Sequence, residues 1–110
     1  MITVRINRKK WLRGEGFIVS RLLRLEDGKK CCIGFLATKL GATRKQIEEQ
    51  SALTEVKNAS CQKFLERENP NYELDNAYVT NDDEGLLENE RESNLKDIGK
   101  EMGVNFVFYN

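Results

Sequence analysis

Two charged side chains near the start of the chain, Arg13 and Glu15, stand next to glycines, where the backbone is exposed and free to bend. An arginine guanidinium presents a planar fork of N–H donors that suits phosphate and carboxylate groups. Trp11 could add an aromatic face for a cation or a planar ligand, and Ser20 and Arg21 follow closely. This segment therefore predicts a binding site for a small anionic ligand. Two plainer interpretations stay open: Arg13 and Glu15 pair only with each other, or Trp11 serves only to anchor the core.

A second polar pair, Asn81 and Asp82, supplies an amide and a carboxylate that folding could bring to the first segment. Such groups accept hydrogen bonds from a base or a peptide. The same stretch resembles part of a calcium loop, but with Gly85 at the sixth loop position the twelfth is Arg91, where a carboxylate ligand is required. The predicted ligand-binding residues are therefore Trp11, Arg13, Glu15, Ser20, Arg21, Asn81 and Asp82.

The chain contains no histidine, which removes the commonest general base near neutral pH and the commonest transition-metal ligand. Catalysis by a Ser-His-Asp or Cys-His arrangement is therefore excluded within the chain. Glu15 or Asp82 could act as a base, but no pattern specifies a reaction. We therefore favour a protein without catalytic activity.

Three cysteines, Cys31, Cys32 and Cys61, do not have the spacing of a zinc site, which normally uses four ligands in spaced pairs. Adjacent cysteines also seldom bond to each other, because a disulfide needs suitably separated Cα atoms and correctly aimed Cβ atoms. We expect free, buried thiols in a reducing compartment. We expect no metal site and no cofactor.

The tripeptide Gly28-Lys29-Lys30 invites comparison with a phosphate-binding P-loop, but the first glycine of that motif is missing and Cys31 stands where serine or threonine is needed. A weaker hypothesis remains, in which the two lysines meet an anion at the start of a helix. A solvated turn followed by a helix is the interpretation that we favour.

The length of 110 residues suits one domain, residues 1–110. Residues 1–45 carry 12 Lys and Arg against 3 Asp and Glu, whereas residues 46–110 carry 6 against 15. The two halves either neutralise each other in the fold or present one basic and one acidic patch. No apolar run approaches the roughly 20 residues that span a bilayer, and early arginines and lysines interrupt any secretion signal. We expect a cytoplasmic protein.

Alternating apolar residues predict a strand at each end of the chain, over residues 2–7 and 104–109, and the two strands could pair in one sheet. Residues 17–19 and 22–25 also have β character. Gly34 inside the first helical pattern serves either close packing or a helix start. Residues 71–85 are polar and predict a loop. The expected architecture is a single α+β domain with three to four helices, over about residues 29–40, 43–50, 54–69 and 89–102.

Four segments are distinctive: the R-G-E-G segment at residues 13–16, the G-K-K-C-C-I-G-F segment at 28–35, the N-D-D loop at 81–83 and the helix-to-strand ending at 103–108. Together they resemble segments of a family of small, largely uncharacterised bacteriophage proteins. The resemblance covers most of the chain but not residues 50–75. It implies a phage product in a bacterial cytoplasm, where small accessory proteins often block a host factor or counter a defence system.

Residues and resemblance together favour a non-catalytic binding module that sequesters a nucleotide-type signal or another small anionic ligand. The alternative is an inhibitor of a host protein that acts through a charged interface, and homo-oligomerisation with complementary charged faces also stays open. Neither a membrane nor a nucleic acid is an expected partner, because the short basic cluster around Trp11 lacks a recognisable nucleic-acid-binding motif.

Overall fold

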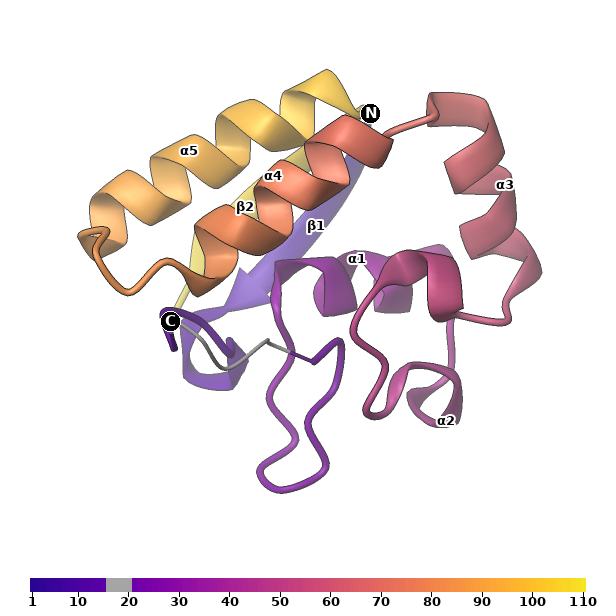
Figure 1. Cartoon of the computed structure of the whole chain (residues 1–110), viewed down its shortest axis with the longest axis horizontal. Helices are drawn as coiled ribbons and strands as arrows, with labels where there is room; N and C mark the ends of the chain where they lie inside the picture. Colours follow the sequence, from indigo (N-terminus) through magenta and orange to yellow (C-terminus); the bar gives the residue numbers. More distant parts are fainter. Residues whose placement is uncertain (16–20) are drawn as a thin grey trace.

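The two ends of the chain form a small parallel sheet (Figure 1) in the computed structural model, which describes residues 1–15 and 21–110. Strand β1 (Ile2–Asn7) pairs with β2 (Val104–Tyr109), and the register runs from Ile2 opposite Val104 to Asn7 opposite Tyr109. Val4 and Ile6 on β1 and Phe106 on β2 are buried on one face of the sheet. The predicted pairing of the terminal strands is confirmed, and the architecture is α+β.

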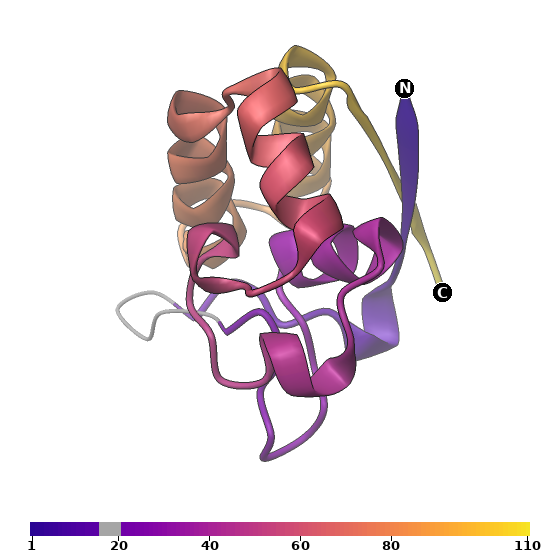
Figure 2. The same cartoon turned by 90° about the vertical axis from the view of Figure 1, so that its right-hand side faces the viewer.

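The helices lie on one side of this sheet, as Figure 2 shows. Helix α1 (Cys32–Leu40) packs against β1, α5 (Glu88–Glu101) packs against β2, and α4 (Asn71–Asp82) packs against both α5 and α1. Short 3-10 turns follow β1 and precede α3 (Ala59–Glu68). The elements between the strands are η1 (Arg8–Lys10), α1 (Cys32–Leu40), α2 (Arg44–Ile47), η2 (Leu53–Glu55), α3 (Ala59–Glu68), α4 (Asn71–Asp82) and α5 (Glu88–Glu101).

Two glycines allow helices to approach other backbone segments closely. A Cβ atom at Gly34 would lie 1.9 Å from the carbonyl oxygen of Leu22, and one at Gly99 would lie 2.7 Å from the carbonyl oxygen of Val104. Only glycine avoids these clashes without a shift of the backbone. Of the two alternatives for Gly34, the structure therefore supports close packing.

Helix α4 occupies most of the stretch that the sequence predicts to be a loop, so that prediction is wrong. Its buried residues are Leu74, Ala77 and Asn81, which follow one face of a helix at spacings of three and four. An asparagine in a core-facing position and a small alanine in another leave too weak an apolar pattern to recognise. With α4, the described residues form five α-helices.

Other predicted elements also differ from the structure. Helix α1 begins at Cys32 and not at residue 29, and α2 ends at Ile47 and not near residue 50. The predicted helix from residue 54 is the turn η2 followed by α3, which Asn58 caps by accepting a hydrogen bond from the Cys61 amide. The last helix begins before the predicted capping box, with Glu90 accepting from the Leu87 amide. Residues 22–25 form only an isolated bridge, from Leu23 to Glu48, and the predicted strand at 17–19 lies outside the described residues.

All three cysteines are free and buried, which confirms the prediction for Cys31, Cys32 and Cys61. Burial disfavours the thiolate and raises the pKa of each thiol, to about 12 for Cys31. These cysteines therefore act as core side chains. Among the described residues, none of the helices combines the length and the apolar character needed to cross a lipid bilayer.

Candidate functional site

Two clefts adjoin one backbone pairing. The Leu12 amide donates to the Lys30 carbonyl over 2.8 Å, and the Lys30 amide donates to the Lys10 carbonyl over 3.0 Å. Lys10 and Lys30 line one cleft, whereas their neighbours Trp11 and Lys29 line the other.

The second of these clefts contains the core of the predicted site, and we call it the paired cleft. It has a volume of about 480 Å³ and is bordered by residues 11–15 and by the start of α5. Trp11 is only 1% exposed, and its indole Nε1 donates to Oδ1 of Asn81 over 2.8 Å. The expected approach of Asn81 to the Trp11 segment is therefore confirmed.

The side chain of Asn81 is occupied by the protein itself. Its Oδ1 also accepts from the Cys32 amide, and its Nδ2 donates to the Leu12 carbonyl and to Oδ1 of Asp82. The Asn81 carbonyl in turn accepts from the Gly14 amide. Asn81 thus joins α4, the start of α1 and the N-terminal segment in the interior, where an unpaired polar group would be costly.

Arg13 and Glu15 do not pair with each other, contrary to one of the interpretations of the sequence. Arg13 Nε lies 2.9 Å from Oε2 of Glu88, and its guanidinium carbon lies 4.5 Å from the centroid of the Trp11 ring. Glu15 Oε2 lies 3.0 Å from Nη1 of Arg24. Each of the two charges therefore has an opposite charge from elsewhere in the chain.

A buried arginine closes the paired cleft. Arg91 is 5% exposed; its guanidinium contacts the Asp83 and Leu86 carbonyls, and its Nη1 lies 3.2 Å from Oε1 of Glu88. These contacts tie the loop after α4 to the first turns of α5. Arg13 and Arg91 thus share the carboxylate of Glu88. The charges of the paired cleft are largely neutralised within the protein.

The other predicted residues are placed as follows. Ser20 lies outside the described residues. The carbonyl of Arg21 accepts from the Cys31 amide over 3.1 Å, and Arg21 is not among the described residues that line either cleft. Asp82 is half-buried beside Asn81.

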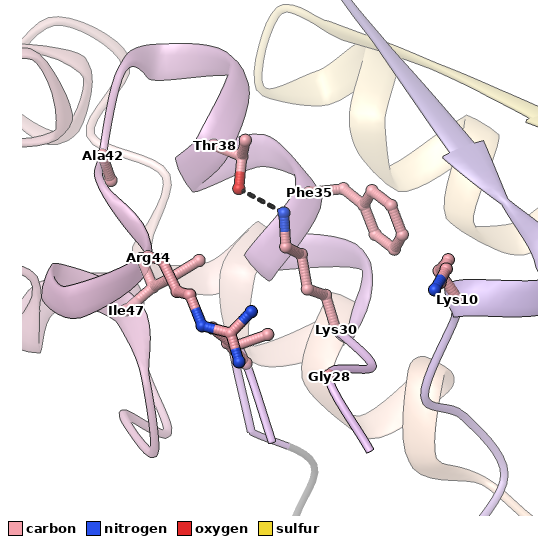
Figure 3. A pocket seen from close by; sticks show the side chains of 9 residues that line it. Lys10, Gly28, Lys30, Phe35, Thr38, Ala42, Arg44 and Ile47 are labelled. Carbon is pink, nitrogen blue, oxygen red and sulfur yellow. Dashed lines mark hydrogen bonds between the residues drawn. The ribbon is translucent and has the colours of Figure 1, made fainter. Parts of the chain in front are cut away.

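The first cleft, which we call the basic cleft, has a volume of about 420 Å³. Figure 3 shows Lys30 extending into it, with Arg44 of α2 on one side and Lys10 on the far side of the Phe35 ring. The Lys30 ammonium donates to the Thr38 hydroxyl over 2.8 Å and lies 5.5 Å from the Phe35 ring centroid. The apolar wall of the basic cleft consists of Leu23, Phe35, Ala42 and Ile47.

Backbone pairing positions the cations of the basic cleft. The bridge between Trp11 and Lys30 sets the backbone of Lys10 beside that of Lys30. The Glu49 amide donates to the Leu23 carbonyl over 2.8 Å, which ties the chain just after α2 to Leu23 and places Arg44 at the cleft. Three cations from separate parts of the chain therefore line the basic cleft, with Lys10 beyond the Phe35 ring (Figure 3).

The charge of the basic cleft is not neutralised by its walls. None of the described residues that line it carries a carboxylate, and no described carboxylate lies within 4.0 Å of Lys10, Lys30 or Arg44. Burial, followed by repulsion from Arg44, lowers the pKa of Lys30. A bound anion would relieve this repulsion, so the arrangement suits anion binding.

The predicted ligand-binding residues do not include Lys10, Lys30 or Arg44, which line the basic cleft. The Gly28-Lys29-Lys30 tripeptide is the available signal, although only its second lysine lines the basic cleft. Arg44 carries no local signal, because its contribution depends on the pairing between residues 23 and 49. Among the described residues there is no group of three or more side chains that could hold a metal ion.

Comparison with known proteins finds no match: no family model, no curated protein and no solved structure matches this chain. The resemblance to phage proteins therefore stays a prediction. The geometry of the two clefts carries the functional argument.

Proposed function

We propose that this protein is a non-catalytic binding module that sequesters a small anionic ligand in the basic cleft. A nucleotide-type signal is the ligand class that we favour. The observation that carries the proposal is that Lys10, Lys30 and Arg44 line one cleft that has no carboxylate among its described lining residues. The resemblance to phage proteins supports a role in counter-defence or host takeover in the bacterial cytoplasm.

The arrangement of Lys30 supports binding over catalysis. Thr38 and Phe35 hold its ammonium in place before a ligand arrives, which lowers the entropy lost on binding. Thr38 itself donates to the Gly34 carbonyl over 3.0 Å, so its hydroxyl has a defined orientation. These groups can bind and orient an anion, but they present no nucleophile activated by a neighbouring base.

A thermal-shift screen with linear and cyclic nucleotides tests the proposal. A ligand at 100 times its dissociation constant should stabilise the protein by about 2.7 kcal/mol. The matched variant is Lys30→Met with Arg44→Gln, which should lose this stabilisation while remaining folded. Native mass spectrometry of the protein purified from bacteria would show a retained ligand directly. If none of the nucleotides stabilises the protein, the small-ligand proposal is overturned.

A second candidate function, inhibition of a host protein, is favoured by the outer face of α4. Tyr72 and Val79 are 76% and 69% exposed and lie seven residues apart on the same face of the helix, with Asp75 between them and Asp83 beyond. Exposed aromatic and apolar groups among carboxylates fit a partner with a basic rim around an apolar patch.

Affinity capture from bacterial lysate, with the wild type compared to Tyr72→Ser plus Val79→Ser, tests this alternative. A partner lost in the double variant but retained in Lys30→Met would support it. A partner retained in both variants would contradict the assignment to α4.

A further inference from the structure

We propose that the basic cleft takes a nucleoside phosphate, with the phosphoryl group at Lys30 and Arg44 and the base against Phe35. The inference rests on the proposed function and narrows its ligand class. The observation behind it is that cations and an apolar wall occupy the same cleft.

The apolar wall is the feature that an inorganic anion leaves unused. Leu23, Ala42 and Ile47 are buried residues of the lining, and Phe35 is a half-buried aromatic residue of the same lining. Ligand sites are typically apolar clefts with a few convergent polar groups, and this volume of about 420 Å³ falls in their usual range. A ligand that fills the cleft therefore needs an organic body as well as a charge.

The Phe35 ring indicates which kind of organic group the ligand carries. Flat rings stack on aromatic side chains, and this interaction tolerates different bases because every base has a π-face. The Lys30 ammonium already lies 5.5 Å from the Phe35 ring centroid. A phosphate ester with its base on Phe35 can therefore reach Lys30 with its phosphoryl oxygens.

The cations specify the other end of the ligand. The Lys30 ammonium has three N–H donors, one of which goes to Thr38, so two remain for an anion. Arg44 adds a planar fork that suits phosphate oxygens. A neutral nucleoside would leave these groups without a partner.

Calorimetric titration with AMP, UMP, ribose 5-phosphate and pyrophosphate separates the two parts of the cleft. AMP and ribose 5-phosphate differ only in the base. We expect AMP to bind at least about tenfold more tightly than ribose 5-phosphate, since stacking of a base on an aromatic side chain has this magnitude. Phe35→Leu, which retains apolar bulk, should remove most of the difference. Tyr109→Leu, an exposed aromatic residue on β2, is the matched control and should leave it unchanged.

The outcomes distinguish this inference from the proposed function. Equal affinities for AMP, UMP and ribose 5-phosphate, unchanged in Phe35→Leu, would overturn the base site and leave the anion site standing. Pyrophosphate that binds more tightly than AMP would also overturn it. Failure of all four probes to bind would overturn both proposals.

Discussion

The paired cleft and the basic cleft share one stretch of backbone but use their charges in opposite ways. In the paired cleft Arg13 and Arg91 meet Glu88, and Asn81 satisfies buried groups of its neighbours. In the basic cleft Lys30 and Arg44 repel each other. A set of polar residue types therefore indicates a binding site only when the fold also leaves their charges uncompensated.

The comparison also relates to the charge asymmetry of the sequence. Arg8 Nε lies 2.7 Å from Oε2 of Glu92, and together with the pair from Arg13 to Glu88 it joins the basic first half to the acidic second half. Arg8 accordingly lowers the pKa of Glu92. Part of the basic charge is thus neutralised internally, and the cations of the basic cleft belong to the part without an ion pair among the described residues.

The largest effect should come from Asn81→Ala. It leaves the Trp11 indole N–H and the Cys32 amide without their acceptor in the interior. We expect the free energy of unfolding to fall by about 3 kcal/mol, because each buried unpaired group costs about 1–3 kcal/mol. Urea denaturation measures the change. Asn94→Ala, at an exposed position of α5, is the matched control and should change stability by less than about 0.5 kcal/mol. A similar small loss for Asn81→Ala would show that the paired cleft is not a structural centre.

The next effect should be on anion affinity in Lys30→Met. Removing one of the cations of the basic cleft should weaken pyrophosphate binding about tenfold, as expected for a charge-assisted contact of about 1.5 kcal/mol. Stability should be unchanged or slightly higher, because a half-buried charge is replaced by an apolar side chain. The neighbouring Lys29→Met, which lines the paired cleft, should bind pyrophosphate as the wild type does. Equal losses in the two variants would mean that general surface charge, and not the basic cleft, attracts the anion.

Anion affinity should also depend on alkaline pH. The pKa of Lys30 is lowered, so its charged, anion-binding form is complete at lower pH and is lost as the pH rises through this lowered value. A phosphate monoester such as ribose 5-phosphate keeps a constant charge above about pH 7.5. Its affinity should therefore fall at alkaline pH in the wild type and stay nearly flat in Lys30→Met. Identical pH profiles would rule out Lys30 as a contact of the anion.

The smallest effect should come from Arg13→Gln. Arg13 and Glu88 are partly exposed, and such pairs contribute less than about 1 kcal/mol. We expect a loss of about 0.5 kcal/mol in urea denaturation, including the contact with Trp11, and unchanged pyrophosphate affinity. Arg67→Gln, which breaks the more exposed pair with Glu68, is the control with no measurable loss. Weaker pyrophosphate binding by the Arg13→Gln variant would indicate that the anion binds in the paired cleft and not in the basic cleft.

Patterns of local origin were sufficient to predict much of the fold. Three predictions that depend only on nearby residues are confirmed: the alternation along the terminal strands, the capping box at Thr43 and the end of α3 before Pro70. In the capping box, the Thr43 side chain accepts a hydrogen bond from the Gln46 amide. Helix α4 was missed because Asn81 stands where the helical pattern requires an apolar residue. The role of Asn81 becomes visible only when Trp11 and Cys32, distant in sequence, donate to it.

The candidate site could be predicted only in part for the same reason. The approach of Asn81 to Trp11 was expected. Its effect, which is to occupy the polar groups of Asn81, depends on partners from two other segments, Trp11 with Leu12 and Cys32. The basic cleft depends on the pairing of Lys10 with Lys30 and on the position of Arg44, which no local pattern encodes. Long-range backbone pairing thus determines which charges remain available.

The most direct test of the different roles of the two clefts is a titration with pyrophosphate followed by amide chemical shifts in the NMR spectrum of the wild-type protein. Saturable shifts should concentrate at Lys30, Thr38 and Arg44, and they should disappear in Lys30→Met with Arg44→Gln. Shifts that concentrate instead at Gly14 and Leu87, in the paired cleft, would contradict the account.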